Sequence, residues 1–215
     1  MNSRKVSEDM GDCRAAQETL EAQFERFRDH CIIIRRDYNT YYQLFFSDSD
    51  ELLKKVAGHF FNDISEIMLR DWILQVCKLM DRKAFKVGGL EFETISVELI
   101  NSRLKDVGAF TDGLRELSKA ILSYGKKLIP ARNKRIAHLD KEYAFSDEML
   151  GVTSVEELEE FLKNIQLYCD EVGRAIDVGP LDFSCSSGPG DVLDLIKILE
   201  MHYEVPEEEV GCLLK

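Results

Sequence analysis

The sequence predicts an all-α protein, a bundle of five to seven helices in which long helices run antiparallel to one another. Two observations lead to this prediction. Apolar residues recur at steps of three and four along most of the chain, which is the spacing of one face of an α-helix. Runs that alternate between apolar and polar residues, which indicate strands, are almost absent.

The first predicted helix covers residues 15–46, and its apolar stripe is largely aromatic. The stripe consists of Leu20, Phe24, Phe27, Cys31, Ile34, Tyr38, Tyr41 and Phe45. Tyrosines in such a row could stack on nucleobases, but the helical spacing favours packing in a core. Residues 47–51 end this helix, and Asp48 and Glu51 have the spacing of a capping box for the next one.

The second predicted helix covers about residues 50–82 and is long enough that we expect a kink near Asn62-Asp63. Residues 83–96 read as a loop around Gly88-Gly89, with a brief extended segment after it but no sheet. Further helices are predicted over residues 96–107, 111–128, 154–178 and 192–203.

The chain divides into two parts on composition. Residues 1–178 form the predicted helical domain, and residues 179–215 form an appendage. This appendage comprises a linker rich in Gly, Pro and Ser, a short helix and an acidic tail. The linker follows a helix and lacks the Gly-Lys-Ser/Thr ending of a phosphate-binding loop, so we do not expect it to hold a nucleotide.

The charge balance argues against a protein that binds nucleic acid nonspecifically over much of its surface. The chain has 28 basic and 40 acidic residues and a formal net charge of −12, whereas phosphate binding depends on concentrated positive charge. Basic residues do gather over residues 126–141, where six of them accompany one acid, Asp140. Any contact with nucleic acid is therefore expected to be local, although such a run is also typical of a solvated helix face.

The cysteines and the N-terminus indicate a cytoplasmic protein. The six cysteines are scattered and form no C-x-x-C pair, as expected of reduced thiols. The first residues lack the apolar segment of a signal peptide, and no stretch is apolar enough to cross a membrane. We expect a soluble protein with no membrane partner and no cofactor.

Residues 130–140 combine the groups most suited to chemistry on a phosphodiester. Arginine offers a planar fork that matches a phosphate, and histidine exchanges protons near neutral pH. If the segment is helical, Arg132 lies about a third of a turn out of line with His138, so one chain alone does not pair them. A second copy, or a bend at Pro130, which together with Gly125 is expected to interrupt the preceding helix, could close the site.

The same residues carry a family resemblance. Arg132-Asn133 followed after four residues by His138 resembles the signature of HEPN domains, and the run over residues 132–140 is similar to the abortive-infection-U branch. Leu79-Met80-Asp81 resembles the earlier core helix of that branch, and the resemblance covers roughly residues 15–178. A related HEPN variant has tyrosine two residues after the histidine, but Asp140 stands there in this chain.

The resemblance implies a HEPN-like bundle and a metal-independent endoribonuclease of prokaryotic defence or abortive infection. His138 would act as acid or base on a ribose 2′-hydroxyl, Arg132 would hold the scissile phosphate, and Asn133 would orient one of them. Substrate binding is expected from Lys127, Lys134 and Arg135. The implied partners are a second copy, an RNA substrate, and an antitoxin or other second protein. Two alternatives remain: a noncatalytic HEPN-like dimer that binds RNA or protein, and a structural helical protein.

Overall fold

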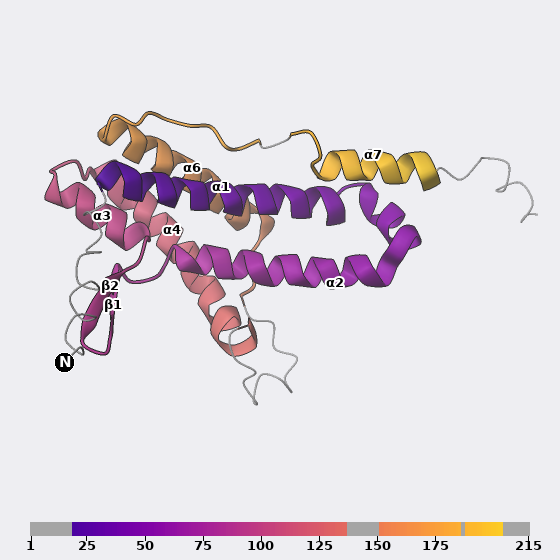
Figure 1. Cartoon of the computed structure of the whole chain (residues 1–215), viewed down its shortest axis with the longest axis horizontal. Coiled ribbons are helices and arrows are strands. Elements are labelled where there is room, and N and C mark those ends of the chain that lie inside the picture. Colours follow the sequence, from indigo (N-terminus) through magenta and orange to yellow (C-terminus); the bar gives the residue numbers. More distant parts are fainter. Residues whose placement is uncertain (1–18, 137–150, 186–187, 204–215) are drawn as a thin grey trace, which may run out of the picture.

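The protein is described by a computed structural model that covers residues 19–136, 151–185 and 188–203 (Figure 1). These residues form six α-helices, which confirms the prediction of an all-α bundle. The helices are α1 (Leu20–Phe45), α2 (Ser49–Lys78), α3 (Val97–Asp106), α4 (Asp112–Ala131), α6 (Val155–Ala175) and α7 (Val192–Tyr203). A π-helical turn, η1 (Arg132–Ile136), continues α4, and two short strands, β1 (Ala84–Val87) and β2 (Leu90–Glu93), follow α2.

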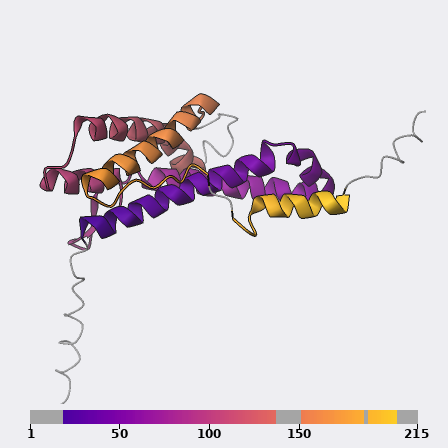
Figure 2. The ribbon, with the colours of Figure 1, turned by 90° about the horizontal axis from the view of Figure 1, so that it is seen from above.

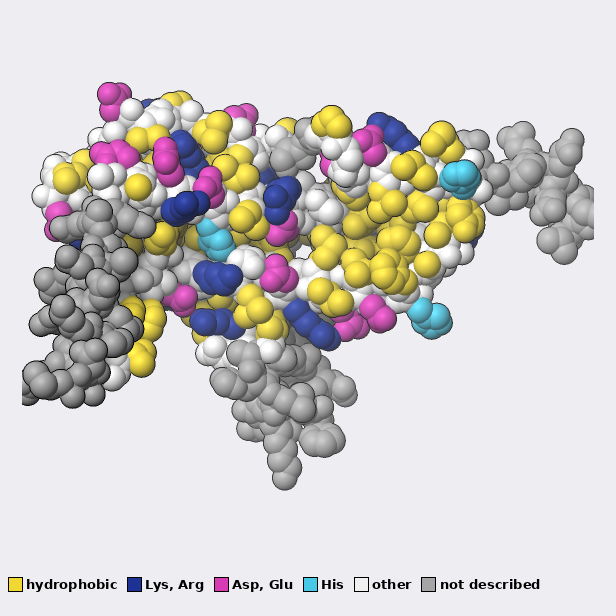
Figure 3. All heavy atoms as spheres, viewed as in Figure 1, with side chains coloured by type: hydrophobic (Ala, Val, Ile, Leu, Met, Phe, Trp, Pro, Cys, Tyr) yellow, Lys and Arg dark blue, Asp and Glu magenta, His cyan; other side chains and the backbone are white. Residues whose placement is uncertain are grey.

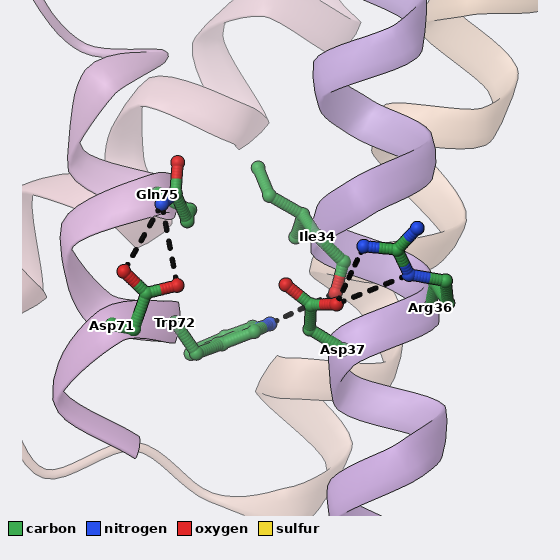
Figure 4. A network of polar contacts seen from close by, with 6 residues as sticks. All are labelled: Ile34, Arg36, Asp37, Asp71, Trp72 and Gln75. Carbon is green, nitrogen blue, oxygen red and sulfur yellow. Dashed lines mark hydrogen bonds and ion pairs between the residues drawn. The ribbon is translucent and has the colours of Figure 1, made fainter. Parts of the chain in front are cut away.

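The two longest helices, α1 and α2, lie side by side and antiparallel, and they form the axis of the molecule (Figures 1 and 2). A hydrogen bond fixes their relative position: the indole Nε1 of Trp72 in α2 donates to the main-chain carbonyl of Ile34 in α1, at 3.0 Å (Figure 4). Helix α2 is kinked at Ala57, which has φ −159° and ψ 62°, and not near Asn62-Asp63 as the sequence suggested.

The hydrophobic core occupies one end of this helix pair. There, α3, α4 and α6 pack against the first half of α1 and the last turns of α2 (Figure 2). The largest side chain in the core is Tyr168, which is fully buried. Its hydroxyl donates to Asn101 Oδ1 at 2.8 Å, and Ser118 Oγ donates to the same oxygen at 3.1 Å, so three helices share one satisfied polar group.

The opposite end of the helix pair is much thinner. Residues 38–69, which we call the distal half, extend beyond α4 and α6, and α7 packs against them (Figures 1 and 2). Figure 3 shows hydrophobic side chains gathered over this end, between α7 and α2. Within it, only Leu44, Ser49 and Leu53 are buried. The distal half therefore leaves much apolar surface open to solvent.

The strands β1 and β2 form an antiparallel hairpin in which Phe85 pairs with Phe92. Gly88 and Gly89 make the turn with φ of 59° and 84°, as a type I′ turn requires. The sequence indicated a turn and a brief extended segment here, without a sheet. Four residues per strand are too few for the alternation to stand out, and all but Ala84 are exposed, so burial adds no pattern.

The residues after α6 pack onto the bundle. Phe183 is buried in the core, and the carbonyl of Ser184 accepts hydrogen bonds from Arg35 Nε at 3.0 Å and Asn39 Nδ2 at 3.1 Å. The composition marks this segment as a linker, but it is hydrogen-bonded to α1 through the carbonyl of Ser184. None of the helices in the described ranges is long and apolar enough to cross a membrane.

Candidate active site at the end of α4

Helix α4 carries the first residues of the motif and is held tightly at both ends. Thr111 caps its start, where Thr111 Oγ1 accepts a hydrogen bond from the amide of Leu114 at 3.2 Å. Near its end, Gly125 lies so close to Met80 that a Cβ on Gly125 would overlap the thioether. The end of α4 is therefore pressed against the C-terminal end of α2.

The helix does not stop at Gly125 or Pro130, contrary to the sequence prediction. It runs through both to Ala131 and widens into the π-helical turn η1. Gly125 is tolerated because the close contact with Met80 needs a residue without a side chain. Pro130 lies in the last turn of α4, where its missing N–H removes only one hydrogen bond of the helix.

Arg132 is the first residue of the π-helical turn, and it faces α2. Its Nη1 lies 3.6 Å from Asp81 Oδ1, and the two side chains are about one third exposed, 36% and 34%. Burial raises the pKa of the neighbouring Cys77 thiol, and the charge of Arg132 opposes this shift. The motif arginine is thus held beside a carboxylate while part of its guanidinium remains open to solvent.

The other predicted site residues are placed less completely. Asn133 is exposed and Lys134 is half-buried. Arg135 belongs to the turn η1. His138 and Asp140 lie outside the described residues, so the pairing of arginine and histidine stays a prediction. The structure therefore brings Arg132 and Asn133 to the same turn at the end of α4.

Lys127 lies one turn before this group and is engaged elsewhere. Its Nζ forms a short hydrogen-bonded ion pair with Glu157 at the start of α6. The hydrogen bond from Lys127 lowers the pKa of Glu157, which also accepts a hydrogen bond from the Ser154 amide in a capping box. A substrate phosphate at Lys127 would have to compete with this carboxylate.

Two acidic partners of the motif were not assigned from the sequence. Asp81 entered the sequence analysis only within Leu79-Met80-Asp81, and Glu157 only through the helix predicted over residues 154–178. Both pairs join residues at least 30 positions apart. No local spacing could reveal them, because they depend on how α2, α4 and α6 pack.

The described part of the site offers a guanidinium, a carboxylate beside it and an exposed amide, all at the open end of a helix. This set can bind and orient an oxyanion, but a proton donor or acceptor near neutral pH must come from a further residue. Within residues 19–136, 151–185 and 188–203, no three His, Cys, Asp or Glu side chains converge as a metal site requires.

Comparison with known proteins identifies the family. The AbiU2 family (HEPN_AbiU2) matches residues 17–195, which is most of the chain and extends through the linker into α7. No curated protein and no solved structure matches the chain significantly. The match covers well over half of the chain and agrees with the bundle of long helices, so the chain belongs to the AbiU2 family of HEPN-type abortive-infection proteins.

Proposed function

We propose that this protein is a metal-independent endoribonuclease of HEPN type that acts in abortive infection. The observation that carries the proposal is the position of Arg132, which stands at the π-helical end of α4 with its guanidinium partly open to solvent. The proposal is supported by membership of the AbiU2 family and by the sequence Arg132-Asn133, which four residues separate from His138.

The proposed reaction is transesterification within the RNA strand. His138 takes the proton from a ribose 2′-hydroxyl, the oxygen attacks the adjacent phosphorus, and the bond to the 5′-oxygen of the next nucleotide breaks. A proton then reaches this leaving oxygen, so the products are a 2′,3′-cyclic phosphate and a 5′-hydroxyl end. Arg132 stabilises the charge on the phosphate, and Asn133 holds the phosphate or the imidazole by a hydrogen bond. Lys134 and Arg135 contact flanking phosphates. Lys127 also contacts a phosphate, once its ion pair with Glu157 has broken.

We further propose that the enzyme acts in the cytoplasm of a prokaryotic cell as a homodimer. A second motif segment would complete the site, because positions 132 and 138 would not share one face of a regular helix. An antitoxin or another second protein would restrain it until phage infection. RNA is the substrate that fits a local basic segment in an acidic chain.

The test is cleavage of a cellular RNA mixture by the purified protein in EDTA, with the product ends identified. His138→Ala should slow cleavage by roughly 10²–10⁴-fold, the range for a positioned acid or base. Arg132→Ala should slow it as well, and Arg132→Lys should restore only part of the rate because the planar fork is lost. If the wild type cleaves no faster than His138→Ala and its expression leaves growth unchanged, the nuclease proposal fails.

One observation favours a second candidate, a noncatalytic HEPN-like module that binds RNA or protein. The carboxylate of Asp81 already accompanies Arg132 and competes with any phosphate there. In such a module Arg132 serves to fix α4 against α2. Arg132→Ala would then lower the free energy of unfolding, and neither the wild type nor the variant would cleave RNA, which separates the two candidates.

A further inference from the structure

A cavity of about 390 Å³ lies beside the end of α4, and this volume is in the range of small-molecule sites. Its lining comes from α1, α2, α4 and the chain around the start of α6. Tyr124 and Leu128 of α4 are the buried members of the lining, and Tyr42 and Phe46 of α1 stand at its exposed edge. We call this cavity and its edge the aromatic groove.

The lining of the aromatic groove is rich in rings and carries no charge. Six of its fourteen residues are aromatic, against 9% of the whole chain. None of the fourteen is charged, although 32% of the chain is. Aromatic side chains are the surfaces on which proteins stack unpaired nucleobases, because both partners present a flat π face. The lining therefore suits a flat ligand without a charge of its own.

The rings of the groove are held in place before any ligand arrives. Tyr124 stacks on Phe161 of the core, with ring centroids 4.4 Å apart and an angle of 15° between the planes. The indole of Trp72 is fixed by its hydrogen bond to α1. At the edge, Tyr42 and Phe46 are nearly parallel, with centroids 6.2 Å apart and planes at 11°. Rings that are already ordered lose little conformational entropy on binding.

The groove also offers groups that can form hydrogen bonds. Among the described residues, the hydroxyls of Tyr38 and Tyr42 have no hydrogen-bond partner, and that of Tyr124 lies 3.4 Å from Thr153 Oγ1. A phenol hydroxyl both donates and accepts, and a nucleobase has donors and acceptors along its edges. Ring faces together with free hydroxyls match a base better than they match a hydrocarbon.

The uncharged groove adjoins the charged motif. Leu128 lies four residues before Arg132, which is about 6 Å along a helix axis. Lys127, which precedes Leu128, pairs with Glu157 at the start of α6. A nucleotide has the same division, because its uncharged base is joined through the ribose to a charged phosphate. A phosphate at Arg132 would place the attached base at the groove.

We propose that the aromatic groove binds one unpaired nucleobase of the RNA substrate, which stacks on Tyr42 and Phe46 while its phosphate lies at Arg132. The inference rests on the proposed function for its choice of RNA as the ligand. A base in a duplex is already stacked and paired, so the substrate is a single strand or a loop. The groove residues bind the base and take no part in the transfer of protons.

The acidity of the chain agrees with this restricted contact. With a formal net charge of −12, the protein repels a long stretch of phosphates. Stacking of a base depends on no charge, so it adds affinity where cations are few. One base in the groove and one or two phosphates at the end of α4 form a contact that an acidic protein can make.

The experiment measures binding of a short 2′-O-methyl oligoribonucleotide to the purified full chain. This probe lacks the 2′-hydroxyl nucleophile and is not cleaved, so binding is separated from the reaction. Trp72 lines the groove and is the single tryptophan of the chain, so a base that enters should quench its emission. Wild type and His138→Ala should show the same quenching. An oligomer of the same length without bases should not quench Trp72 and should bind more weakly.

The variants test whether rings hold the base. Tyr42→Leu and Phe46→Leu keep apolar side chains but remove a ring, and each should weaken binding by roughly 5–150-fold, the range for one base-aromatic stack. Tyr42→Phe keeps the ring and should weaken binding less. Phe85→Leu is the matched control, because it alters another exposed stacked pair, Phe85 and Phe92 on the β1–β2 hairpin with centroids 5.7 Å apart. It should bind as the wild type does, and helical circular dichroism should be equal in all variants.

The outcomes separate this inference from the nuclease. A wild type whose Trp72 emission does not change would overturn the inference and leave the groove to a protein surface. Variants Tyr42→Leu and Phe46→Leu that both bind as the wild type, or equal affinity for the oligomer without bases, would overturn it as well. A protein that cleaves RNA without quenching keeps the nuclease and loses the groove. One that shows groove-dependent quenching and cleaves no RNA keeps the groove and loses the nuclease.

Discussion

Arg132 Nη1 and Asp81 Oδ1 lie 3.6 Å apart, which links the motif arginine to the end of α2. Because both side chains are about one third exposed, solvent screens the pair, and its loss should cost at most about 1 kcal/mol of stability. Its effect on activity should be larger, since a guanidinium without an anchor is poorly positioned for the phosphate. We expect Asp81→Asn to slow RNA cleavage by roughly 10–10²-fold.

The matched control for this change is Glu66→Gln, which removes the partner of Arg70 on α2 at 2.6 Å. It should leave cleavage unchanged, and thermal unfolding should show a similar small loss for both variants. Equal cleavage rates for wild type and Asp81→Asn would mean that Asp81 does not position Arg132.

Pro130 lies two residues before Arg132, next to the junction of α4 and the π-helical turn η1. Pro130→Ala supplies the missing N–H and favours continuation of the regular α-helix, so the variant should unfold at a higher temperature. The same change rotates Arg132 away from its place on the π-helical turn, and RNA cleavage should fall. Calorimetry and the cleavage assay together check this. A variant that is more stable and equally active would show that RNA cleavage does not need the π-helical turn.

The ion pair between Lys127 and Glu157 should make stability depend on pH. Its hydrogen bond lowers the pKa of Glu157 below 4.5 in the folded protein, so the unfolded chain binds the proton more readily. The stabilisation is therefore present above pH 4.5 and is lost as the pH falls through the lower, folded pKa. Melting curves should differ between wild type and Lys127→Met at neutral pH and converge in acid. A difference that stays constant with pH would exclude this pair as its source.

Gly173 allows a close backbone contact at the end of α6. A Cβ there would overlap the carbonyl oxygen of Gly179, whose amide donates to the carbonyl of Gly173 at 3.0 Å. Gly173→Ala should destabilise the protein by about 1–3 kcal/mol, because backbone has to move. Gly58→Ala is the control: the glycine is helical and nothing lies within 4 Å of an added Cβ. It should be neutral or slightly stabilising in denaturant unfolding.

The sequence predicts those parts of the fold that depend on residues close together in the chain, such as the helices and some of their starts. The helix start predicted at residue 154 is confirmed, and reciprocal bonds between Ser154 and Glu157 form a capping box there. Asp48 has similar sequence spacing but makes no side-chain cap, because it already has helical φ and ψ of −61° and −10°. The predicted place of the kink in α2 was also wrong: the kink lies at Ala57, directly before Gly58, and not near Asn62-Asp63.

The site could be predicted only in part. The residues of the motif are neighbours in the sequence, whereas the charged residue beside Arg132 is distant in the sequence. Arg132 and Asn133 follow from the motif, and the structure places them on one turn. The carboxylate beside Arg132 comes from a residue 51 positions earlier, and the length of α2 and the contact of Gly125 with Met80 decide that it arrives there. The catalytic roles of Arg132, Asn133 and His138 stay predictions.

The burial of Phe183 has a consequence for synthesis of the protein. This side chain belongs to the core although it lies eight residues after Ala175, the last residue of α6. On the ribosome, α1 to α6 are therefore complete before the last piece of their core has been added. During synthesis, this part of the core can therefore close only after Phe183 has left the ribosome, later than every residue of α1 to α6.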